Sequence, residues 1–322
     1  MIVSYQTDIT LINNFILFSS INFDSILLTG ASGFLGKSLL KSLKSKHVIT
    51  LARNNSDINA DIINIDCHIP SIDLVIHAAG KAHLNPTNEF EKRLFFDINV
   101  KGTKKLLDCL DNSNSFPKSF VYISSVSVYG LNIGNNIDEN TLLNAKDPYG
   151  KSKIQAENLV TKWCNEHNVI CTILRLPLVV GSNPPGNLGS MINGIKKGFY
   201  FNIAGGVARK SMVLDSDVAK HILKAAAVGG IYNLTDGYHP TIFELSNHLA
   251  TQLGRRTPMN LPYWLAKFIS FGGDIIGASA PIDSLRLSKI TSDLTFDDAK
   301  ARKAFDWSPT PVLNGFNVSD NN

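Results

Sequence analysis

A tyrosine and a lysine lie four residues apart in the segment KDPYGKSKIQAE, and a serine ends an apolar run upstream. Asp147 can cap a helix that begins at Pro148, which places Tyr149 and Lys153 one turn apart on one face. An ammonium beside a phenol favours its ionised form, so a tyrosine becomes a usable proton donor or acceptor near neutral pH. The hydroxyl of Ser125 could bond the same substrate oxygen. Together they predict acid-base catalysis at a carbon–oxygen centre, although a solvated helix can carry the same tyrosine and lysine.

The loop TGASGFLG adds a binding site to this catalytic pattern. Three glycines directly follow the apolar run SILLT and open an amphipathic segment. Glycine permits a tight turn and the close approach of backbone to a pyrophosphate, and a helix N-terminus offers free N–H groups. A tight strand-to-helix turn without a ligand would also use glycines, but the strand, turn and helix context favours dinucleotide binding. The expected cofactor contacts are Gly30, Gly33, Phe34, Leu35 and Gly36.

The end of the second predicted strand should read the adenosine ribose of that dinucleotide. An acid there would accept a hydrogen bond from the 2′-hydroxyl of NAD, whereas an arginine would pair with the 2′-phosphate of NADP. The sequence TLARNN has Arg53 and no acid, which favours NADP(H) over NAD(H), although an arginine that stacks on adenine or faces solvent also fits. Asp66 in INIDC would accept a hydrogen bond from the adenine amino group or simply form a turn.

Apolar runs alternate with amphipathic segments through the first half of the chain, as in a parallel sheet covered by helices. We therefore predict an α/β fold, a Rossmann-like doubly wound parallel sheet with a smaller C-terminal lobe that binds substrate. The first helix should bury a stripe formed by Phe34, Leu35, Leu39, Leu40 and Leu43 and turn its lysines to water. The expected strands are 25–30, 47–53, 71–80, 119–130 and 169–181, and the expected helices are 33–46, 95–110 and 148–167.

The domain organisation follows from a change in pattern beyond Gly181. There the alternation gives way to the loop SNPPGNLGS and to helices mixed with short strands. We predict an N-terminal extension over residues 1–24 and an NAD(P)-binding Rossmann domain over 25–180, to which segments around 207–235 return. Residues 181–322 should mainly form the substrate-binding lobe.

The composition describes a globular chain able to bury a large core, with 322 residues, 44% hydrophobic and 18% charged. A formal net charge of +4 without a long basic run is too small for a nucleic-acid surface. The apolar segment ITLINNFILFSSINF is interrupted by Asn13, Asn14 and Ser19, so no stable membrane insertion is expected. The cysteines lack CxxC or histidine-rich spacing, which predicts neither metal nor disulfides and favours reduced thiols in the cytoplasm; they are Cys67, Cys109, Cys164 and Cys171.

Six motifs occur in a fixed order along the chain: the glycine loop, HAAG, NVKGTKKLL, ISSVSVYG, PYGKSK and LRLPLVVG. In this combination the sequence resembles the extended short-chain dehydrogenase/reductases, and within them the NAD-dependent epimerase/dehydratase family, which acts on nucleotide sugars. The resemblance extends from about residue 25 to the FDW near residue 307. It implies a nicotinamide cofactor and a UDP-sugar substrate.

The resemblance assigns the catalytic roles. Ser125, Tyr149 and Lys153 would be the catalytic set. Ser125 would also contact the substrate, and Tyr149 and Lys153 would also contact the cofactor, with Lys153 at the nicotinamide ribose. Ser125 is preferred to Ser124 because it stands three residues before VYG, as the family's Ser or Thr does.

The resemblance also marks the cofactor site and an interface. Ala78, Ala79 and Gly80 of HAAG would line the cofactor, and Asn99 would support the site through backbone or water contacts. His77 is expected to be a packed strand residue rather than a catalyst. Relatives often form homodimers through two helices, one of which carries the tyrosine and the lysine.

The reaction type depends on where the chain departs from the family pattern. The 4,6-dehydratases carry an Asp-Glu pair after the catalytic residue, but this chain has Val126 and Ser127 and so lacks the acid and base for elimination. Epimerases commonly carry an Asp that reads the ribose and an Asn in RYFNxxG, where this chain has Arg53 and Leu178. The resemblance therefore favours reduction of the C4 keto group of a UDP-4-keto-6-deoxy-N-acetylhexosamine in surface polysaccharide biosynthesis.

Two alternatives to this reductase stay open. A 4-epimerase of UDP-glucose or UDP-GlcNAc would oxidise C4 and return the hydride to the other face with the same residues. A catalytically silent dinucleotide-sensing protein would keep the fold without turnover. Such relatives usually lose the tyrosine or the lysine, and this chain keeps both together with Ser125.

Candidate substrate contacts lie in the second half. The segment PPGNLGSM resembles the family's diphosphate loop, with Asn187 as its polar contact. ARKSMVLDSDVAK resembles RDFVxVDDVA, so Arg209 or Lys210 would neutralise a phosphate, and Arg286 in SLRLSKIT is a further candidate. For each basic residue a solvated surface position is the competing interpretation. The aromatic run Phe199 to Phe201 would floor the uracil or, more commonly for such a run, fill the core.

Overall fold

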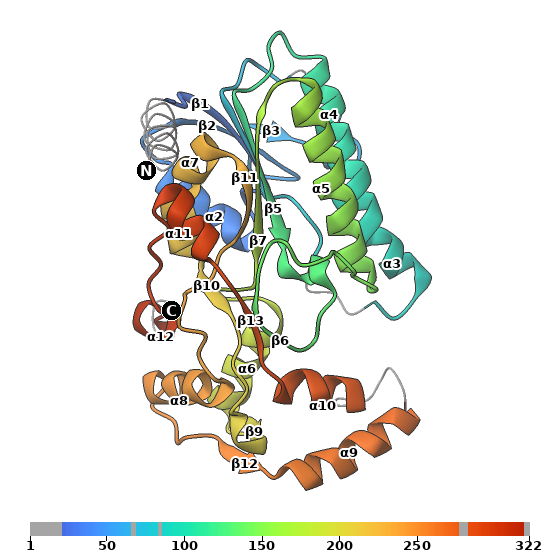
Figure 1. Ribbon diagram of the computed structural model, residues 1–322, viewed down its shortest axis with the longest axis vertical. Coiled ribbons are helices and arrows are strands. Elements are labelled where there is room, and N and C mark those ends of the chain that lie inside the picture. The colour runs from blue at the N-terminus through green and yellow to red at the C-terminus, as the bar shows by residue number, and fades with distance from the viewer. Residues whose placement is uncertain (1–20, 66–68, 83–85, 277–282, 319–322) are drawn as a thin grey trace, which may run out of the picture.

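The computed structural model describes residues 21–65, 69–82, 86–276 and 283–318. The upper part of the molecule in Figure 1 is built on a seven-stranded sheet whose strands all run parallel. The chain adds strands on one side of β1 and then, after β3, on its other side. Across the sheet the order is β11 (Gly230–Asn233), β7 (Ile170–Leu176), β5 (Ser119–Ser125), β4 (Leu74–His77), β1 (Ser25–Thr29), β2 (His47–Ala52) and β3 (Ile58–Asn59).

Helices cover both faces of this sheet (Figure 1). In β1, Leu27 belongs to the core beneath one set of helices, and Ile26 and Leu28 belong to the core on the opposite face. Burial on both faces explains the continuous apolar runs, and the predicted α/β doubly wound fold is confirmed. One face carries α3 (Glu89–Phe96), α4 (Gly102–Asp111) and α5 (Pro148–Glu166), and the other α2 (Phe34–Ser42), α7 (Asp215–Val228) and α11 (Ala299–Phe305).

The predicted strand 169–181 is wrong as one element, because the chain divides it at Pro177. β7 ends at Leu176, and β8 (Leu178–Val180) pairs with β10 (Met212–Leu214) in a separate two-stranded sheet. Proline has no N–H to donate to a ladder, so the chain leaves the large sheet there. The predicted strand 119–130 also ends early, at Ser125, and continues as the 3₁₀ helix η2 (Val126–Tyr129).

The first helix is shorter than predicted and buries a narrower stripe. α2 ends at Ser42, and its lysines at positions 37 and 41 are exposed. Leu39 and Leu43 are buried, whereas Leu40 is 37% exposed. One residue corresponds to about 100° around a helix, so Leu40 lies at the flank of the stripe that Leu39 defines. The prediction that Leu40 belongs to the inner stripe is wrong.

A second, smaller lobe forms the lower part of Figure 1. Its core joins side chains of α6, α8 and the β8–β10 pair, among them Leu188, Leu245 and Met212. Two further strand pairs connect distant segments, β6 with β13 and β9 with β12. The bounds are β6 (Gly134–Ile137), α6 (Gly186–Lys197), β9 (Phe201–Ile203), η3 (Ala204–Gly206), α8 (Ile242–Gln252), β12 (Met259–Leu261), α9 (Tyr263–Ile276), α10 (Ser284–Thr291), β13 (Leu294–Phe296) and α12 (Val312–Gly315).

The described residues also bear on membrane spans, metal sites and disulfides. None of the helices in this part of the chain is long and apolar enough to cross a membrane. Within the same residues, no group of three or more His, Cys, Asp or Glu side chains could hold a metal ion. Cys109, Cys164 and Cys171 are free thiols, and Cys67 lies outside the described residues.

Candidate active site

The glycine loop between β1 and α2 is shaped for close approach. Gly30 has a φ of +73°, and a Cβ there would lie 2.7 Å from the backbone nitrogen of Ala79. A Cβ on Gly36 would overlap the carbonyl oxygen of Gly30. Gly33 precedes α2, and no side chain caps that helix, so its first N–H groups are free of side-chain partners. A backbone cradle with an uncapped helix N-terminus fits a pyrophosphate.

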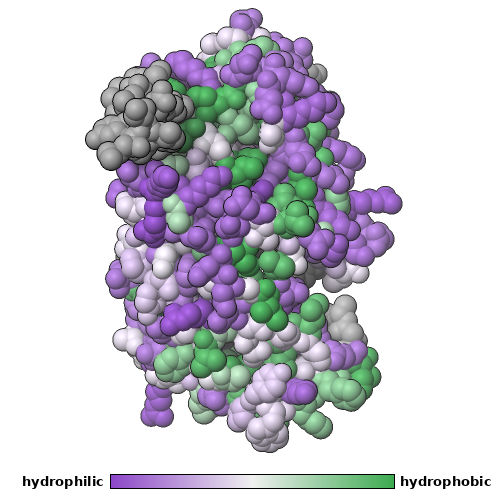
Figure 2. All heavy atoms as spheres, viewed as in Figure 1, coloured by the Kyte–Doolittle hydropathy of each residue, from purple (hydrophilic) through white to green (hydrophobic). Residues whose placement is uncertain are grey.

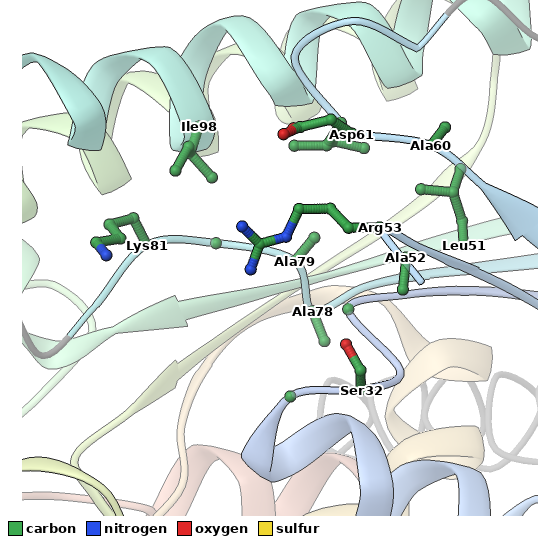
Figure 3. A pocket seen from close by; sticks show the side chains of 14 residues that line it. Ser32, Leu51, Ala52, Arg53, Ala60, Asp61, Ala78, Ala79, Lys81 and Ile98 are labelled. Carbon is green, nitrogen blue, oxygen red and sulfur yellow. The ribbon is translucent and has the colours of Figure 1, made fainter. Parts of the chain in front are cut away.

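A pocket of about 230 Å³ opens at the carboxyl ends of β1, β2 and β4 (Figure 3). It lies where strand order reverses between β1 and β4, the position at which doubly wound sheets bind ligands. Of the predicted cofactor contacts, those that line it are Gly30, Gly33, Arg53, Ala78, Ala79 and Gly80. Phe34 and Leu35 are half-buried in the first turn of α2 and do not line this pocket, nor does the buried Gly36.

Arg53 and Asp61 give the pocket its polar character. In Figure 3 the Arg53 side chain extends across the pocket in the direction of Lys81, and Asp61 lies on the wall above Arg53 in this view. Sequence reasoning missed Asp61 and Lys81 and gave the adenine contact to Asp66, which lies outside the described residues. The signal for Asp61 was its position two residues after the short strand β3. Its carboxylate could accept the adenine hydrogen bond instead.

Asn99 connects the cofactor pocket to α5. Its side-chain oxygen accepts from the backbone N–H of Lys81 at 2.6 Å, and its amide nitrogen donates to Ser152 Oγ of α5 at 2.9 Å. Asn99 lies in the π-helix η1 (Asp97–Lys101), which interrupts the predicted helix 95–110 between α3 and α4. Such π turns are frequent at functional sites, because the extra residue redirects a side chain.

Ser125 and Tyr149 meet at the end of β5. Ser125 is the last residue of the strand, and its hydroxyl lies near enough to the Tyr149 phenol to influence its pKa. The Tyr149 ring packs against Phe95 of α3, with ring centroids 5.8 Å apart. Burial raises the pKa of Tyr149, the nearby Ser125 hydroxyl acts in the opposite direction, and the charge of Asp147 raises it further. In the chain alone the tyrosine is therefore a phenol.

Lys153 lies one turn after Tyr149 on α5 and is buried. Its ammonium donates to the Ile123 carbonyl at 2.8 Å and to the Tyr122 hydroxyl at 3.2 Å, and lies 4.7 Å from the centre of the Tyr122 ring. Burial lowers the pKa of Lys153 to about 8, and the carboxylate of Glu157 opposes that fall.

The HAAG segment lies close to Lys153. A Cβ on Gly80 would lie 3.1 Å from Asn99 Oδ1 and 3.3 Å from Lys153 Nζ. His77 is buried within β4, bonded to Thr29 Oγ1 at 2.7 Å and to Thr103 Oγ1 at 2.9 Å, and burial lowers its pKa to about 3. A neutral histidine with both ring nitrogens engaged is a packing residue, as the sequence indicated.

A buried ion pair joins α5 to β7, and sequence reasoning missed it. Arg175 of β7 donates to both carboxylate oxygens of Glu157, at 3.1 and 2.8 Å, and both side chains are 4% exposed. Glu157 also accepts from Ser124 Oγ at 2.5 Å, and Arg175 donates to the Tyr129 hydroxyl at 3.1 Å. The sequence signal for this ion pair was Glu157, a charged residue one helical turn after Lys153 on the inner face of α5.

The predicted substrate residues are dispersed over the second lobe. Lys210 is half-buried and donates to the carbonyls of Lys289 and Ser292 at 2.8 and 2.7 Å, and burial lowers its pKa. Arg209 donates to the His239 carbonyl at 3.0 Å and lies at the surface.

The other second-lobe candidates lie on helices and on an exposed run. Arg286 on α10 lies 3.4 Å from Asp283, and Asn187 is exposed in the first turn of α6. Phe199 and Phe201 are exposed, whereas Tyr200 packs against the core of this lobe. The expected core-filling role is therefore met only by Tyr200.

The geometry defines a class of protein: a doubly wound sheet with a dinucleotide pocket at its switch point, and a serine, tyrosine and lysine beside it. The model of the NAD dependent epimerase/dehydratase family matches residues 26–235. That range is more than half of the chain, so the protein belongs to this family, and the predicted family is confirmed. It is an enzyme of the short-chain dehydrogenase/reductase type that uses a nicotinamide dinucleotide.

Relatives of known activity resemble the chain over most of its length. The N-acetyl-α-D-glucosaminyl-diphospho-ditrans,octacis-undecaprenol 4-epimerase of Escherichia coli O157:H7 is 29% identical over 91% of this chain and 93% of its own. The UDP-glucose 4-epimerase of Vibrio cholerae is 26% identical over 90% and 92%. The UDP-glucuronic acid 4-epimerase of Bacillus cereus, solved with UDP-glucuronic acid and NAD, is 20% identical over 90% and 95%, with a TM-score of 0.69. At that identity the last likeness shows the fold alone.

Proposed function

We propose that this enzyme is a 4-epimerase of a sugar diphosphate, which removes a hydride from C4 of the sugar and returns it to the other face. The observation that carries the proposal is the placement of the Ser125 hydroxyl near the Tyr149 phenol at the end of β5, with Lys153 one turn further along α5. Both curated relatives named above are 4-epimerases, and each matches about nine-tenths of this chain.

The catalytic side chains have separate tasks. Tyr149 would take the proton of the C4 hydroxyl during oxidation and return it during reduction. Ser125 would hold the same oxygen, since its hydroxyl lies near the phenol. Lys153 would favour the tyrosinate by its charge once its ammonium turns from the Ile123 carbonyl. The bound nicotinamide would take up and return the hydride.

The cofactor would be held by residues that follow β1, β2, β3 and β4. The glycine loop and the backbone N–H groups of Phe34 and Leu35, in the uncapped first turn of α2, would bind the pyrophosphate. Arg53 would pair with a 2′-phosphate, which favours NADP(H), and Asp61 would accept from adenine.

The nicotinamide end would be lined by the β4–α3 segment. Ala78, Ala79 and Gly80 would contact this part of the cofactor, with Lys153 at the ribose and Asn99 fixing the backbone of Lys81. In both halves of the site the side chains present fit a dinucleotide.

The diphosphate of the substrate would be held by the second lobe. Arg209 and Arg286 carry guanidinium groups suited to phosphate oxygens, and the exposed amide of Asn187 would add a polar contact. Lys210 has two of its three donors committed to carbonyls of α10 and its following turn, so it would contribute one donor and its charge. The relatives carry their sugars on UDP or on an undecaprenyl diphosphate, and both carriers present the same charged group.

A second candidate, reduction of a 4-keto sugar, is favoured by Arg53. Reduction consumes a dissociable cofactor, and a guanidinium in the adenosine pocket suits NADPH. The reaction would need the same three catalytic residues. Dehydration is disfavoured, because the two residues after Ser125 are Val126 and Ser127, which supply neither acid nor base.

Product analysis separates these candidates. The purified protein is incubated with UDP-N-acetylglucosamine, with its undecaprenyl-diphosphate counterpart, and with UDP-4-keto-6-deoxy-N-acetylglucosamine plus NADPH or NADH. An epimerase yields the galacto isomer without net cofactor oxidation, whereas a reductase oxidises one cofactor per product. In parallel, Arg53→Ala should weaken NADPH binding by about tenfold and leave NADH binding unchanged. The proposed function is wrong if none of the three sugars is converted.

A further inference from the structure

α9 presents its large apolar side chains to the outside of the molecule. Trp264, Phe268, Phe271 and Ile275 are 70, 76, 67 and 77% exposed. Their spacing of four, three and four residues aligns them in one stripe along the helix, which we call the outward face of α9. In Figure 2 the lower end of the molecule, where Figure 1 places α9, is mostly green and white, whereas purple dominates elsewhere.

The opposite side of the same helix is built for packing. Ala266, Ser270 and Gly273 are buried and recur at the same helical spacing, half a turn away from the outward face. Small residues allow close packing on this side, α10 contacts α9, and Asp274 ties the two helices together by accepting from the backbone and hydroxyl of Ser284. α9 is therefore fixed in its orientation, and its apolar stripe is not the side by which it joins the protein.

The aromatic and charged residues around this stripe match a lipid surface. Tyr263 and Trp264 open the helix, and amphipathic rings of this kind concentrate at the boundary between headgroups and acyl chains. Fourteen residues span about 21 Å, less than the roughly 30 Å hydrocarbon core, so a helix of this length would lie in the surface. Beside it, the β9–β12 pair adds exposed Phe201 and Met259.

The segments that contain α6 and α8 to α10 carry a charge that suits anionic headgroups. Residues 186–210 and 242–291 carry nine basic and three acidic side chains, an excess larger than the +4 of the whole chain. Exposed basic residues of this set include Lys196, Lys197, Arg255, Arg256, Lys267 and Lys289. Apolar burial combined with attraction to anionic lipid is how interfacial helices bind membranes.

We propose that the outward face of α9 binds the surface of an anionic lipid bilayer, where the enzyme acts on a sugar joined through diphosphate to a membrane lipid. The choice of carrier rests on the function proposed above, whereas the docking surface does not. Lys210 bonds to the end of α10, and Arg286 lies on α10, so the candidate diphosphate contacts belong to the same helical pair that would rest on the membrane. A lipid diphosphate would thus reach the site from the bilayer side.

Vesicle flotation tests the docking surface without turnover. The full-length protein is mixed with vesicles of phosphatidylglycerol and phosphatidylethanolamine, beside phosphatidylcholine vesicles. We expect flotation with the anionic vesicles and at least about a tenfold loss of apparent affinity in Phe268→Glu. Phe90→Glu, at a position 70% exposed on α3, is the matched control and should bind as the unaltered protein does.

Three results would overturn the proposal: no flotation of the unaltered protein, equal losses in Phe268→Glu and Phe90→Glu, or a smaller sedimenting mass for Phe268→Glu without lipid. The last would mean that a second copy of the chain covers the outward face.

For the substrate, turnover of the undecaprenyl-linked sugar in vesicles is divided by turnover of a short-chain, water-soluble analogue. That ratio should fall about tenfold in Phe268→Glu, and an unchanged ratio contradicts the proposed route. If neither sugar is converted while flotation holds, only the proposed function fails.

Discussion

α5 and α9 both depart from the usual amphipathic helix, and they do so in opposite directions. α5 turns Ser152, Lys153 and Glu157 into the protein, where Lys153 and Glu157 are nearly inaccessible. α9 turns alanine, serine and glycine inward and leaves Trp264 and Phe268 in contact with solvent. A buried charge and an exposed aromatic side chain both cost free energy, so each arrangement needs a compensating interaction. For α5 the compensation lies within the chain, whereas the described residues supply none for the outward face of α9.

The largest expected effect removes the reactive group of α5. Tyr149→Phe should lower turnover by about 10² to 10⁴-fold, because proton exchange with the C4 oxygen is lost. Cofactor affinity should hold, since the ring still packs against Phe95. Steady-state kinetics and cofactor titration measure the two effects.

Lys151 provides a matched control on the same helix. It is exposed between the tyrosine and Lys153, so Lys151→Ala should change turnover by no more than about twofold. A loss comparable to that of Lys153→Ala would mean that the outward side of α5 also takes part in the reaction. The contrast drawn between the two faces of this helix would then be wrong.

How much of this site the sequence predicts depends on the range of the interactions. The glycine loop, the Pro148 helix start and Ser125 at a strand end are encoded within a few residues each, and the structure has these local elements at the predicted positions. Their convergence follows from the parallel sheet, because the carboxyl ends of its strands share one edge. That is why an α/β pattern predicts where the side chains of Ser125 and Tyr149 meet.

What the sequence did not predict depends on contacts between distant segments. Glu157 pairs with Arg175, eighteen residues away on β7, and nothing in the local pattern of either segment specifies the partner. The outward face of α9 reads as an ordinary apolar stripe, and only the structure reveals which side of the helix is buried. Pro177 did carry a local signal, since a proline rarely continues a central strand.

A smaller effect is expected from breaking the compensation within α5. Glu157→Gln removes the charge that faces Arg175 and should lower the free energy of unfolding by about 3 kcal/mol, because a buried guanidinium is left without its counter-charge. Glu166→Gln on the same helix is the control: its partner Lys162 lies 3.8 Å away and both side chains are exposed, so the change should stay below about 0.5 kcal/mol. Urea unfolding compares the two.

The same variant should also move the pH dependence of turnover. Burial lowers the pKa of Lys153 to about 8, and the charge of Glu157 limits that fall. Replacing Glu157 by glutamine therefore lowers the pKa of Lys153 further. If the ammonium is the active form, the alkaline limb of the activity profile shifts to lower pH. The unfolded chain binds the Lys153 proton up to higher pH than the folded chain does, so this group adds stability as pH rises above about 8. A limb that does not move would separate Lys153 from the reaction.

The smallest effect comes from α9 and tests what covers it. Phe268→Ser should change the free energy of unfolding in water by less than about 0.5 kcal/mol, because the ring is already hydrated in the folded chain. Ala266→Leu, on the buried side two residues earlier, should cost about 1 to 3 kcal/mol, since a fully buried alanine leaves no room for a larger side chain. A loss of more than about 2 kcal/mol for Phe268→Ser would mean that another part of the same chain covers the outward face. The opposition between α5 and α9 would then disappear, because both helices would complete their packing within the protein and no bilayer would be needed.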